Sequence, residues 1–461
     1  MSDLRLVLRS LSARPTSTSI TILLIAIAVA LLLTMRGLRD AGRQSFTRGV
    51  GNAHLVVSAE ASPLVTVLNS LFYANPPRAP ITQAKMTEIV ESFPWAMAVP
   101  TQLGDSFAGF PVVSTTPDFL TIFEPAPGEP WRFAEGRNFE TPYEVVLGSR
   151  VAKETGLGLG DRLHFTHGSG RSRESTPPPP SAVSTEGEAL DPDADAVAAD
   201  ASDEIDLHIH CDHGDHVHDE VVFEVVGVLE PSGTHHDRIV IADLEGGWLV
   251  HAFDRRRAEG RPDPTGVEDL EEADRLSTGL LLRTPTRAGR GSAAIVQQAF
   301  DRLRRDPAIT VASPSTQVDA LFGIVADLDA VFLALGAGIL VSGAASVMLA
   351  LWNSMELRRR QIAVLRVLGC SRPRILGLVL TESAAIGLIG AIAGVFLAVG
   401  GGDVAAELLA RRTGVVIDPL LDTRAAVLVT AATVVLAALA GLAPAIRAYR
   451  TPVADHLRPL D

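Results

Sequence analysis

The chain has 461 residues, of which 47% are hydrophobic, and its mean hydropathy of +0.24 is high for a soluble protein of this length. Its formal net charge is nevertheless −14. These figures argue against a disordered chain, a small disulfide-rich scaffold and a strongly basic nucleic-acid-binding protein, and they indicate that apolar and acidic residues lie in different segments.

Four stretches are apolar and long enough to cross a membrane, since about 18 to 20 such residues in a helix span the hydrocarbon core. We predict transmembrane helices over residues 19–36, 327–352, 375–400 and 425–446. A cleaved signal peptide is the alternative for the first stretch, because arginines precede it and Ala28–Ala30 resembles a cleavage site. Apolar residues continue beyond Ala30, which favours an uncleaved anchor.

Arginines in the short flanking segments predict the orientation of these helices. They are frequent in the amphipathic segment 1–18, in the loop 353–374 and in the tail 447–461, which we expect on the cytoplasmic side. The loop 401–424 has balanced charges and is expected outside. The long segment 37–326 is then also extracytoplasmic.

The net charge also differs between the segment 37–326 and the rest of the chain. Residues 37–326 hold 24 of the 40 Lys and Arg residues and 43 of the 54 Asp and Glu residues, a net charge of −19, whereas the remainder has a net charge of +5. Eleven of the 12 histidines lie in this outer segment. Cys211 is expected outside and Cys370 inside, so the two cannot form an intrachain disulfide.

The outer segment has the pattern of an α+β domain, because short β-type runs alternate with helical patterns. The expected helices lie near Gln83–Ser92 and Ser292–Arg305. The expected strands are His54–Ser58, Val112–Ser114, Glu144–Gly148, Asp161–Thr166, Val221–Leu229, Arg238–Ala242 and Gly279–Arg283. Residues 169–219 interrupt this pattern with a low-complexity insertion that we predict to be disordered and rich in histidine.

Five histidines fall within 11 residues of this insertion: His208, His210, His213, His216 and His218. A hairpin centred on His213 would place the other four on one face, where their imidazoles could bind Zn²⁺ or another transition metal. Nearby aspartates could orient the rings, and Cys211 is a weaker ligand. The alternative is a solvated polar loop with a chance excess of histidine. A second cluster, Thr234–Asp237, is better explained as a turn between two strands.

The cytoplasmic loop contains a basic amphipathic helix. One face of this helix carries Leu357, Gln361, Val364, Leu365 and Leu368, most of the arginines lie elsewhere, and Gly369 is expected to end the helix. Such a helix could lie on anionic lipid or insert into a groove on a cytoplasmic partner.

Residues Arg358–Ser371, RRRQIAVLRVLGCS, closely resemble the signature of FtsX-like (MacB/LolC-type) ABC transporter permeases. The N-terminal LRLVLRSL and Glu382 within Leu380–Ser383 are also similar to family features. So are Val146–Ala152, Leu159–Leu163, Glu224–Asp237 and the ending Pro444–Arg458. The insertion 169–219 departs from the family pattern.

The resemblance implies an integral membrane protein of four transmembrane α-helices, with a large α+β extracytoplasmic domain inserted between helices 1 and 2. It also implies a permease dimer in the bacterial inner membrane, with both termini cytoplasmic, that works with a separate ATPase. The segment that would dock on this ATPase comprises Glu356, Arg358, Arg359, Arg360, Ile362, Leu365, Arg366, Leu368 and Gly369.

The sequence lacks two motifs that would indicate catalysis by this chain. Its only lysines, Lys85 and Lys153, both follow alanine, so it has no Gly-Lys-Ser/Thr, and we expect ATP to bind to and be hydrolysed by the partner. His-Glu-x-x-His is also absent, which disfavours a zinc protease. Glu382 is the one carboxylate in the interior of the predicted helices, since Asp327 and Asp329 lie at the very start of the second one. A structural hydrogen bond near the cytoplasmic end explains Glu382 best.

Two functions are consistent with these features. The first is a non-catalytic permease subunit that acts by mechanotransmission on lipoprotein, lipid, drug or metal-linked cargo. The alternative is a signal relay that activates an extracytoplasmic partner such as a cell-wall hydrolase. The expected partners also include a lipoprotein or adaptor and membrane lipid, but no nucleic acid. Four spans exclude a soluble enzyme, and the lack of a polar lining disfavours a channel.

Overall fold

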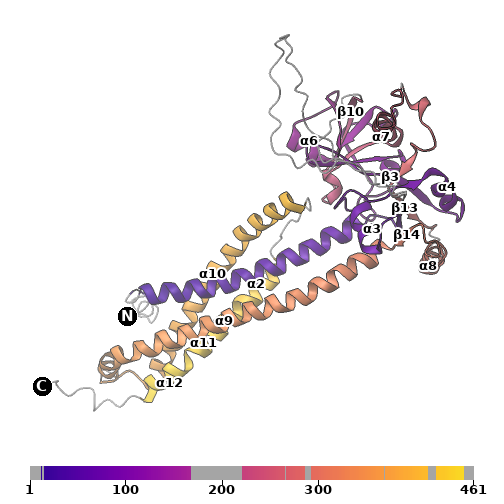
Figure 1. The fold of residues 1–461 in the computed structure, drawn as a ribbon. Coiled ribbons are helices and arrows are strands. Elements are labelled where there is room, and N and C mark those ends of the chain that lie inside the picture. The colour runs from indigo at the N-terminus through magenta and orange to yellow at the C-terminus, as the bar shows by residue number, and fades with distance from the viewer. Residues whose placement is uncertain are drawn as a thin grey trace, which may run out of the picture.

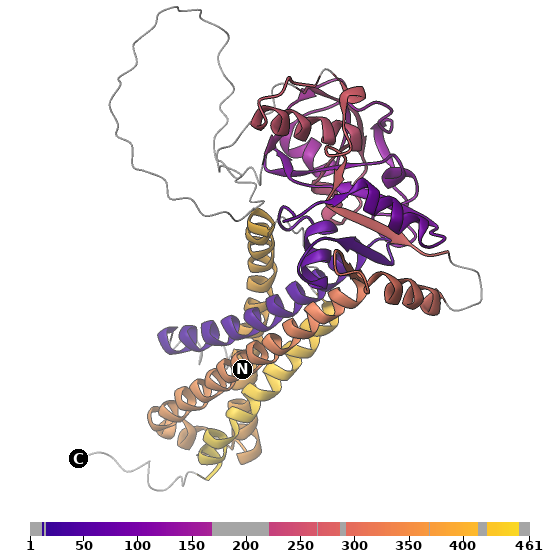
Figure 2. The ribbon, with the colours of Figure 1, turned by 45° about the vertical axis from the view of Figure 1, so that its right-hand side comes forward.

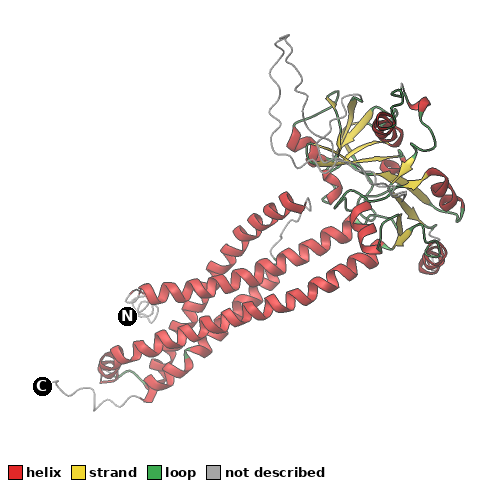
Figure 3. Ribbon diagram, viewed as in Figure 1, coloured by secondary structure: helices red, strands yellow, loops and turns green. Residues whose placement is uncertain are grey.

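The computed structural model describes residues 12, 15–167, 221–264, 266–285, 292–367, 369–413 and 422–450. A bundle of long helices carries a sheet-rich domain at one end (Figure 1). The chain runs through the bundle once, builds the sheet-rich domain and then returns to the bundle for the remaining helices. The strands all lie in this outer domain, whereas the bundle is entirely helical (Figure 3). The predicted fold class is therefore confirmed.

The bundle consists of α2 (Pro15–Gly49), α9 (Pro314–Val367), α10 (Arg372–Thr413), α11 (Thr423–Ala440) and α12 (Leu442–Arg450). Candidate membrane spans lie in Pro15–Gly49, Pro314–Asn353, Arg372–Ala406 and Thr423–Arg447. At 1.5 Å per residue, the 35 residues of α2 and the 54 of α9 are about 52 and 81 Å long, well above the ~30 Å hydrocarbon core. Both helices therefore continue beyond the spans that the sequence predicts.

Glycines allow α10 to pack closely against its neighbours in the bundle. A Cβ atom at Gly390 would lie 2.7 Å from a side-chain atom of Ile25 on α2, and one at Gly394 would lie 2.7 Å from Val29. On the side facing α11, a Cβ at Gly387 would approach Ala437 to 2.5 Å. Small residues at such contacts are how membrane helices gain van der Waals packing, because lipid supplies no hydrophobic force between them.

The outer domain is built on one mixed sheet with the strand order β14-β1-β13-β3-β5-β11-β7-β10-β6. The pairs β5–β11 and β7–β10 are parallel and the other neighbours are antiparallel. The strands on this path are β1 (Leu55–Ser58), β3 (Met97–Gln102), β5 (Phe110–Thr115), β6 (Phe133–Gly136), β7 (Glu144–Leu147), β10 (Phe223–Leu229), β11 (Val240–Asp243), β13 (Gly279–Arg283) and β14 (Thr310–Ala312).

Shorter elements complete the domain. The strands are β2 (Ile81–Thr82), β4 (Asp105–Phe107), β8 (Arg162–Leu163), β9 (Thr166–His167) and β12 (Leu276–Ser277). The helices are α3 (Pro63–Ser70), α4 (Gln83–Glu91), α5 (Asp118–Thr121), α6 (Ser149–Thr155), α7 (Leu244–Ala258) and α8 (Ser292–Leu303), with the 3-10 turns η1 (His235–Arg238) and η2 (Val267–Asp269).

The sheet buries both faces, and the two-residue period of its strands assigns each side chain to one face. One face packs with α3, the end of α2 and the aromatic residues that follow β5. On the opposite face, β1 and β13 pack against α4 and α8, whereas β11, β7 and β10 pack against α7. The face that meets α2 is thus one of two covered faces, and the edge strand β6 is an exception because three of its four residues are exposed.

Most of the expected strands and both expected helices are present. The expected strand Asp161–Thr166 is wrong in extent, because the chain forms the two short strands β8 and β9 there and these pair with different partners. The expected loop 401–424 is partly helical, since α10 continues to Thr413. The insertion 169–219 and most of segments 1–18 and 447–461 lie outside the described residues.

Candidate functional site

The end of α2 lies inside the outer domain and not at its surface. The helix leaves the apolar run with Arg36 and Asp40 one turn apart, and it ends at Gly49. From two directions, α2 and α9 lie side by side as they approach the sheet (Figures 1 and 2). Arg43 on α2 pairs with Asp319 on α9 at 3.3 Å, and the rings of Phe46 and Phe322 meet edge to face at 5.7 Å.

His236 joins the last carbonyl of α2 to the outer domain. Its Nε2 lies 3.1 Å from the carbonyl oxygen of Gly49, and its Nδ1 lies 2.9 Å from the hydroxyl of Tyr73. A carbonyl can only accept, so Nε2 must carry the proton and Nδ1 must accept a hydrogen bond from Tyr73. Tyr73 has φ of 56°, a left-handed conformation that is uncommon outside glycine.

His235 fixes the neighbouring turn. Its Nε2 donates to the carbonyl oxygen of Leu71 at 2.7 Å, and its ring lies 4.4 Å from that of Phe72. A Cβ atom at Gly49 would lie 2.5 Å from Nδ1 of this histidine. Only glycine lets the end of α2 come so close, and we call the group Gly49, Leu71, Phe72, Tyr73, His235 and His236 the α2 anchoring site.

Aromatic rings exclude water from this site. Phe119, Phe123 and Trp131 all meet the ring of His236 edge to face, with centroids 5.4 to 6.3 Å away. This burial lowers the pKa of His235 to about 4, and burial together with the adjacent His235 lowers the pKa of His236 well below its usual value. Burial also raises the pKa of Tyr73. All three side chains are therefore neutral at physiological pH, as the hydrogen bonds require.

Polar contacts surround the anchoring site. Arg48, in the last turn of α2, binds both carboxylate oxygens of Glu129 at 3.0 and 2.9 Å and donates to the carbonyl of Ser232. Just beyond the helix, Asn52 donates to the carbonyl of Ile122 at 3.0 Å. Two-point guanidinium–carboxylate contacts fix orientation better than a single ion pair does. The helix end is therefore held in position and in rotation.

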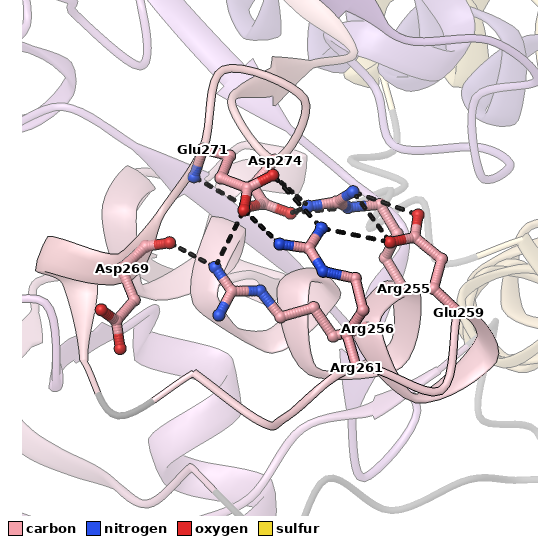
Figure 4. A network of polar contacts seen from close by, with 7 residues as sticks. All are labelled: Arg255, Arg256, Glu259, Arg261, Asp269, Glu271 and Asp274. Carbon is pink, nitrogen blue, oxygen red and sulfur yellow. Dashed lines mark hydrogen bonds and ion pairs between the residues drawn. The ribbon is translucent and has the colours of Figure 1, made fainter.

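A separate polar cluster lies at the end of α7 (Figure 4). Arg255 contacts the buried carboxylate of Asp274 through Nε at 2.8 Å and Nη2 at 2.7 Å. Arg256 donates to the carbonyl of Asp269, and Arg261 binds Glu271. These contacts fasten residues 259–274 to α7, and they serve the stability of the outer domain.

The predicted ATPase-docking residues are only partly visible. The backbone of α9 is helical through Glu356, Arg358, Arg359, Arg360, Ile362, Leu365 and Arg366, but the side chains of 354–365 lie outside the described parts, as does Leu368. Gly369 has φ of +93° and lies two residues after Val367, the last residue of α9, so its predicted role in ending the helix is confirmed. Glu382 is buried in α10, with 6% of its surface exposed.

The predicted metal ligands His208, His210, His213, His216 and His218 lie outside the described residues. Among the residues that the structure does describe, no group of three or more His, Cys, Asp or Glu side chains could hold a metal ion. Thr234 caps the 3-10 turn η1 (His235–Arg238) between β10 and β11, so the interpretation of Thr234–Asp237 as a turn is confirmed. Sequence reasoning missed the anchoring role of this turn and of Tyr73.

Two family models match the chain. Residues 18–176 match the MacB-like periplasmic core domain, and residues 333–453 match the FtsX-like permease C-terminal domain. The chain belongs to the FtsX-like (MacB/LolC-type) permease family. In this permease the first match includes Gly49 and Tyr73, whereas His235 and His236 lie outside both matched ranges. It is a multi-pass membrane protein. No curated protein matches the chain.

Proposed function

We propose that this permease is the non-catalytic membrane subunit of an ABC transporter and that α2 and α9 carry movement from a separate ATPase to the outer domain. The observation that supports this most strongly is the path of α2. It is one uninterrupted helix from the far end of the bundle to the core of the outer domain, where buried hydrogen bonds hold its last carbonyl. A rigid element fixed at one end transmits a displacement applied at the other.

The expected orientation and assembly follow from the same arrangement. The start of α2 and the end of α12 lie at the end of the bundle opposite the outer domain (Figure 1), in keeping with two cytoplasmic termini. We expect a dimer of the permease with ATPase subunits docked on residues 356–369, and cargo recognised by the acidic outer domain. Lipoprotein, lipid, drug or metal-linked molecules are the expected cargo classes.

The docking residues can be tested by reversing their charge. We expect that changing Arg358, Arg359 and Arg360 to Glu lowers the amount of ATPase that co-purifies with the full chain at least about tenfold, because several charge contacts are lost together. The matched control changes Arg302, Arg304 and Arg305 of the outer domain to Glu, which alters the net charge equally. Equal ATPase recovery from both variants would contradict the proposed docking site.

A second experiment distinguishes the transport function from the signal relay. Cross-linking of the outer domain in intact cells, followed by identification of the captured proteins, is expected to yield a lipoprotein or another cargo protein. Capture of a cell-wall hydrolase instead, together with no ATP-dependent movement of cargo, would favour the relay.

We also propose that the histidine-rich segment binds Zn²⁺. The support is the symmetric spacing of His208, His210, His216 and His218 about His213. Titration of the purified full chain with Zn²⁺ is expected to give a site that is lost when these four histidines are replaced by Ala. An unchanged zinc affinity in that variant would refute the site.

A further inference from the structure

The short helix α12 lies at the end of the bundle opposite the outer domain, where it packs against both α9 and α10. Its sequence overlaps the ending Pro444–Arg458, which resembles the family pattern. It contacts Trp352 on α9 and Arg372 on α10, and these two residues flank the predicted ATPase-docking segment.

The first contact joins α12 to α9. The guanidinium carbon of Arg447 lies 4.5 Å from the centre of the Trp352 ring, within the range of a cation–π interaction. Trp352 is the last residue of the predicted transmembrane span before the cytoplasmic segment begins. The entrance to that segment is therefore in contact with α12.

The second contact joins α12 to α10, and here α12 provides the aromatic ring and α10 provides the arginine. The guanidinium carbon of Arg372, the first residue of α10, lies 5.7 Å from the centre of the Tyr449 ring. Arg447 and Tyr449 are two residues apart, which is a rotation of about 200° around a helix, so they lie on nearly opposite sides of α12. α12 is thus placed between the two ends of residues 353–371.

The start of α12 is fixed on α10. It follows Gly441, where a Cβ atom would overlap the hydroxyl of Ser383. Ser383 is fully buried and donates to the carbonyl of Leu380 at 2.9 Å, so it has no freedom to move aside. The position of α12 along α10 is therefore determined by close packing at one end and by Tyr449 at the other.

We propose that α12 sets the spacing of α9 and α10 at the two ends of the docking segment, with Arg447 and Tyr449 as positioning residues for ATPase coupling. This inference rests on the proposed function. If the ATPase displaces residues 353–371, α9 and α10 move together only when the distance between Trp352 on α9 and Arg372 on α10 stays fixed. The two cation–π contacts supply that restraint.

The test compares disruptive and conservative variants of each residue in the complete permease–ATPase complex in lipid nanodiscs. Arg447→Met and Tyr449→Leu are expected to lower the kcat of ATP hydrolysis about fivefold, with the KM for ATP and the amount of bound ATPase unchanged. Arg447→Lys keeps the cation and Tyr449→Phe keeps the ring, so both should remain within about twofold of the unaltered complex.

Two results would overturn the proposal. Wild-type kcat in both disruptive variants would show that α12 has no role in coupling, and equal losses in the conservative variants would show that the contacts act by packing alone. Thermal unfolding in the same nanodiscs identifies any variant that fails to fold, and Trp352→Leu against Trp352→Phe repeats the comparison from α9. An ATPase that neither binds nor responds to the unaltered chain would instead refute the proposed function, and this inference with it.

Discussion

At the scale of single residues, burial determines what His235 and His236 can do. Both rings lie in an aromatic surrounding that holds them neutral, and both use a protonated Nε2 to bind a backbone carbonyl. A solvated His-His pair is a common metal ligand, but here each ring already has a structural partner. Their spacing in the sequence does not distinguish these two roles, because burial depends on Phe119, Phe123 and Trp131 from another part of the chain.

Gly49 provides the sharpest test of this packing. Gly49→Ala is expected to destabilise the protein by about 1 to 3 kcal/mol, since the new Cβ would overlap the His235 ring. Gly37→Ala is the matched control in the same helix, because nothing lies within 4 Å of that position and alanine is the better helix former. Thermal unfolding of the full chain measures both, and equal midpoints would contradict the close approach.

The pH dependence of stability follows from the lowered pKa values at the anchoring site. The unfolded chain takes up protons at these histidines near pH 6.5, whereas in the folded chain His235 does so only near pH 4 and the pKa of His236 is also lowered by burial. Stability should therefore fall by about 2 kcal/mol through His235 between pH 6.5 and 4.5, and His236 should add to this fall. Replacing both residues by Gln should flatten this decline, and an unchanged slope would show that other groups cause it.

The contribution of His251 to stability is expected to change with pH in the opposite direction, because its pKa is raised and not lowered. Its ring lies 3.2 Å from the buried carboxylate of Asp105, whose charge raises the pKa of the histidine above its usual value although burial opposes this. The stabilisation is present below pH 6.5 and is lost as the pH rises through the pKa of the folded state. His251→Gln should thus lower stability at pH 6 and have less effect at pH 9, as read from unfolding midpoints.

At the scale of elements, α2 and α9 are joined above the bundle by two contacts of unequal strength. The Arg43–Asp319 pair is more than half exposed on both sides, so Asp319→Asn should cost less than about 1 kcal/mol. Phe46 packs on both Phe72 and Phe322, so Phe46→Ala should cost about 2 kcal/mol or more. Unfolding midpoints of both variants test whether Phe46→Ala is the more destabilising change. A larger effect of Asp319→Asn would contradict this expectation.

Some elements could be predicted from the sequence and others could not, for identifiable reasons. The long apolar helices and the short apolar runs of β1, β7 and β11 can be recognised from the sequence pattern. β3 cannot be recognised from the sequence pattern because it contains Pro100, which disfavours a strand. In the structure Pro100 lies opposite Leu280 of β13, near the centre of the sheet. α7 was missed because Gly246 and Gly247 weaken its helical pattern, yet a Cβ at Gly247 would overlap Ser114. These glycines reflect packing partners that are distant in sequence.

At the scale of the whole molecule, the charge division predicts which side of the membrane each part occupies. The outer domain has a net charge of −19, and the start of α2, the end of α9 and the helix α12, which border or lie in the arginine-rich flanks, are at the opposite end of the bundle. Positively charged flanks are retained in the cytoplasm, so Cys370 should face inward and Cys211 outward. The structure places Cys370 directly after Gly369, beyond the end of α9 and partly exposed.

Cysteine labelling of intact cells tests this topology with one variant for each side. With Cys211→Ser, an impermeant maleimide should leave the chain unlabelled while a permeant maleimide modifies Cys370. With Cys370→Ser, both reagents should label Cys211. The reverse pattern would place the acidic domain in the cytoplasm and contradict the proposed coupling to a cytoplasmic ATPase.

The central claim is that ATP binding on one side of the membrane moves the outer domain through α2. Hydrogen–deuterium exchange of the permease–ATPase complex in nanodiscs tests it directly at the amides of Leu71–Tyr73 and Ser232–Asp237, because exchange reports local opening. ATP is expected to change exchange at these amides and at residues 356–369 together, and His236→Ala should abolish the change in the outer domain alone. ATP-dependent changes confined to the docking segment, with an unaffected anchoring site, would contradict the account.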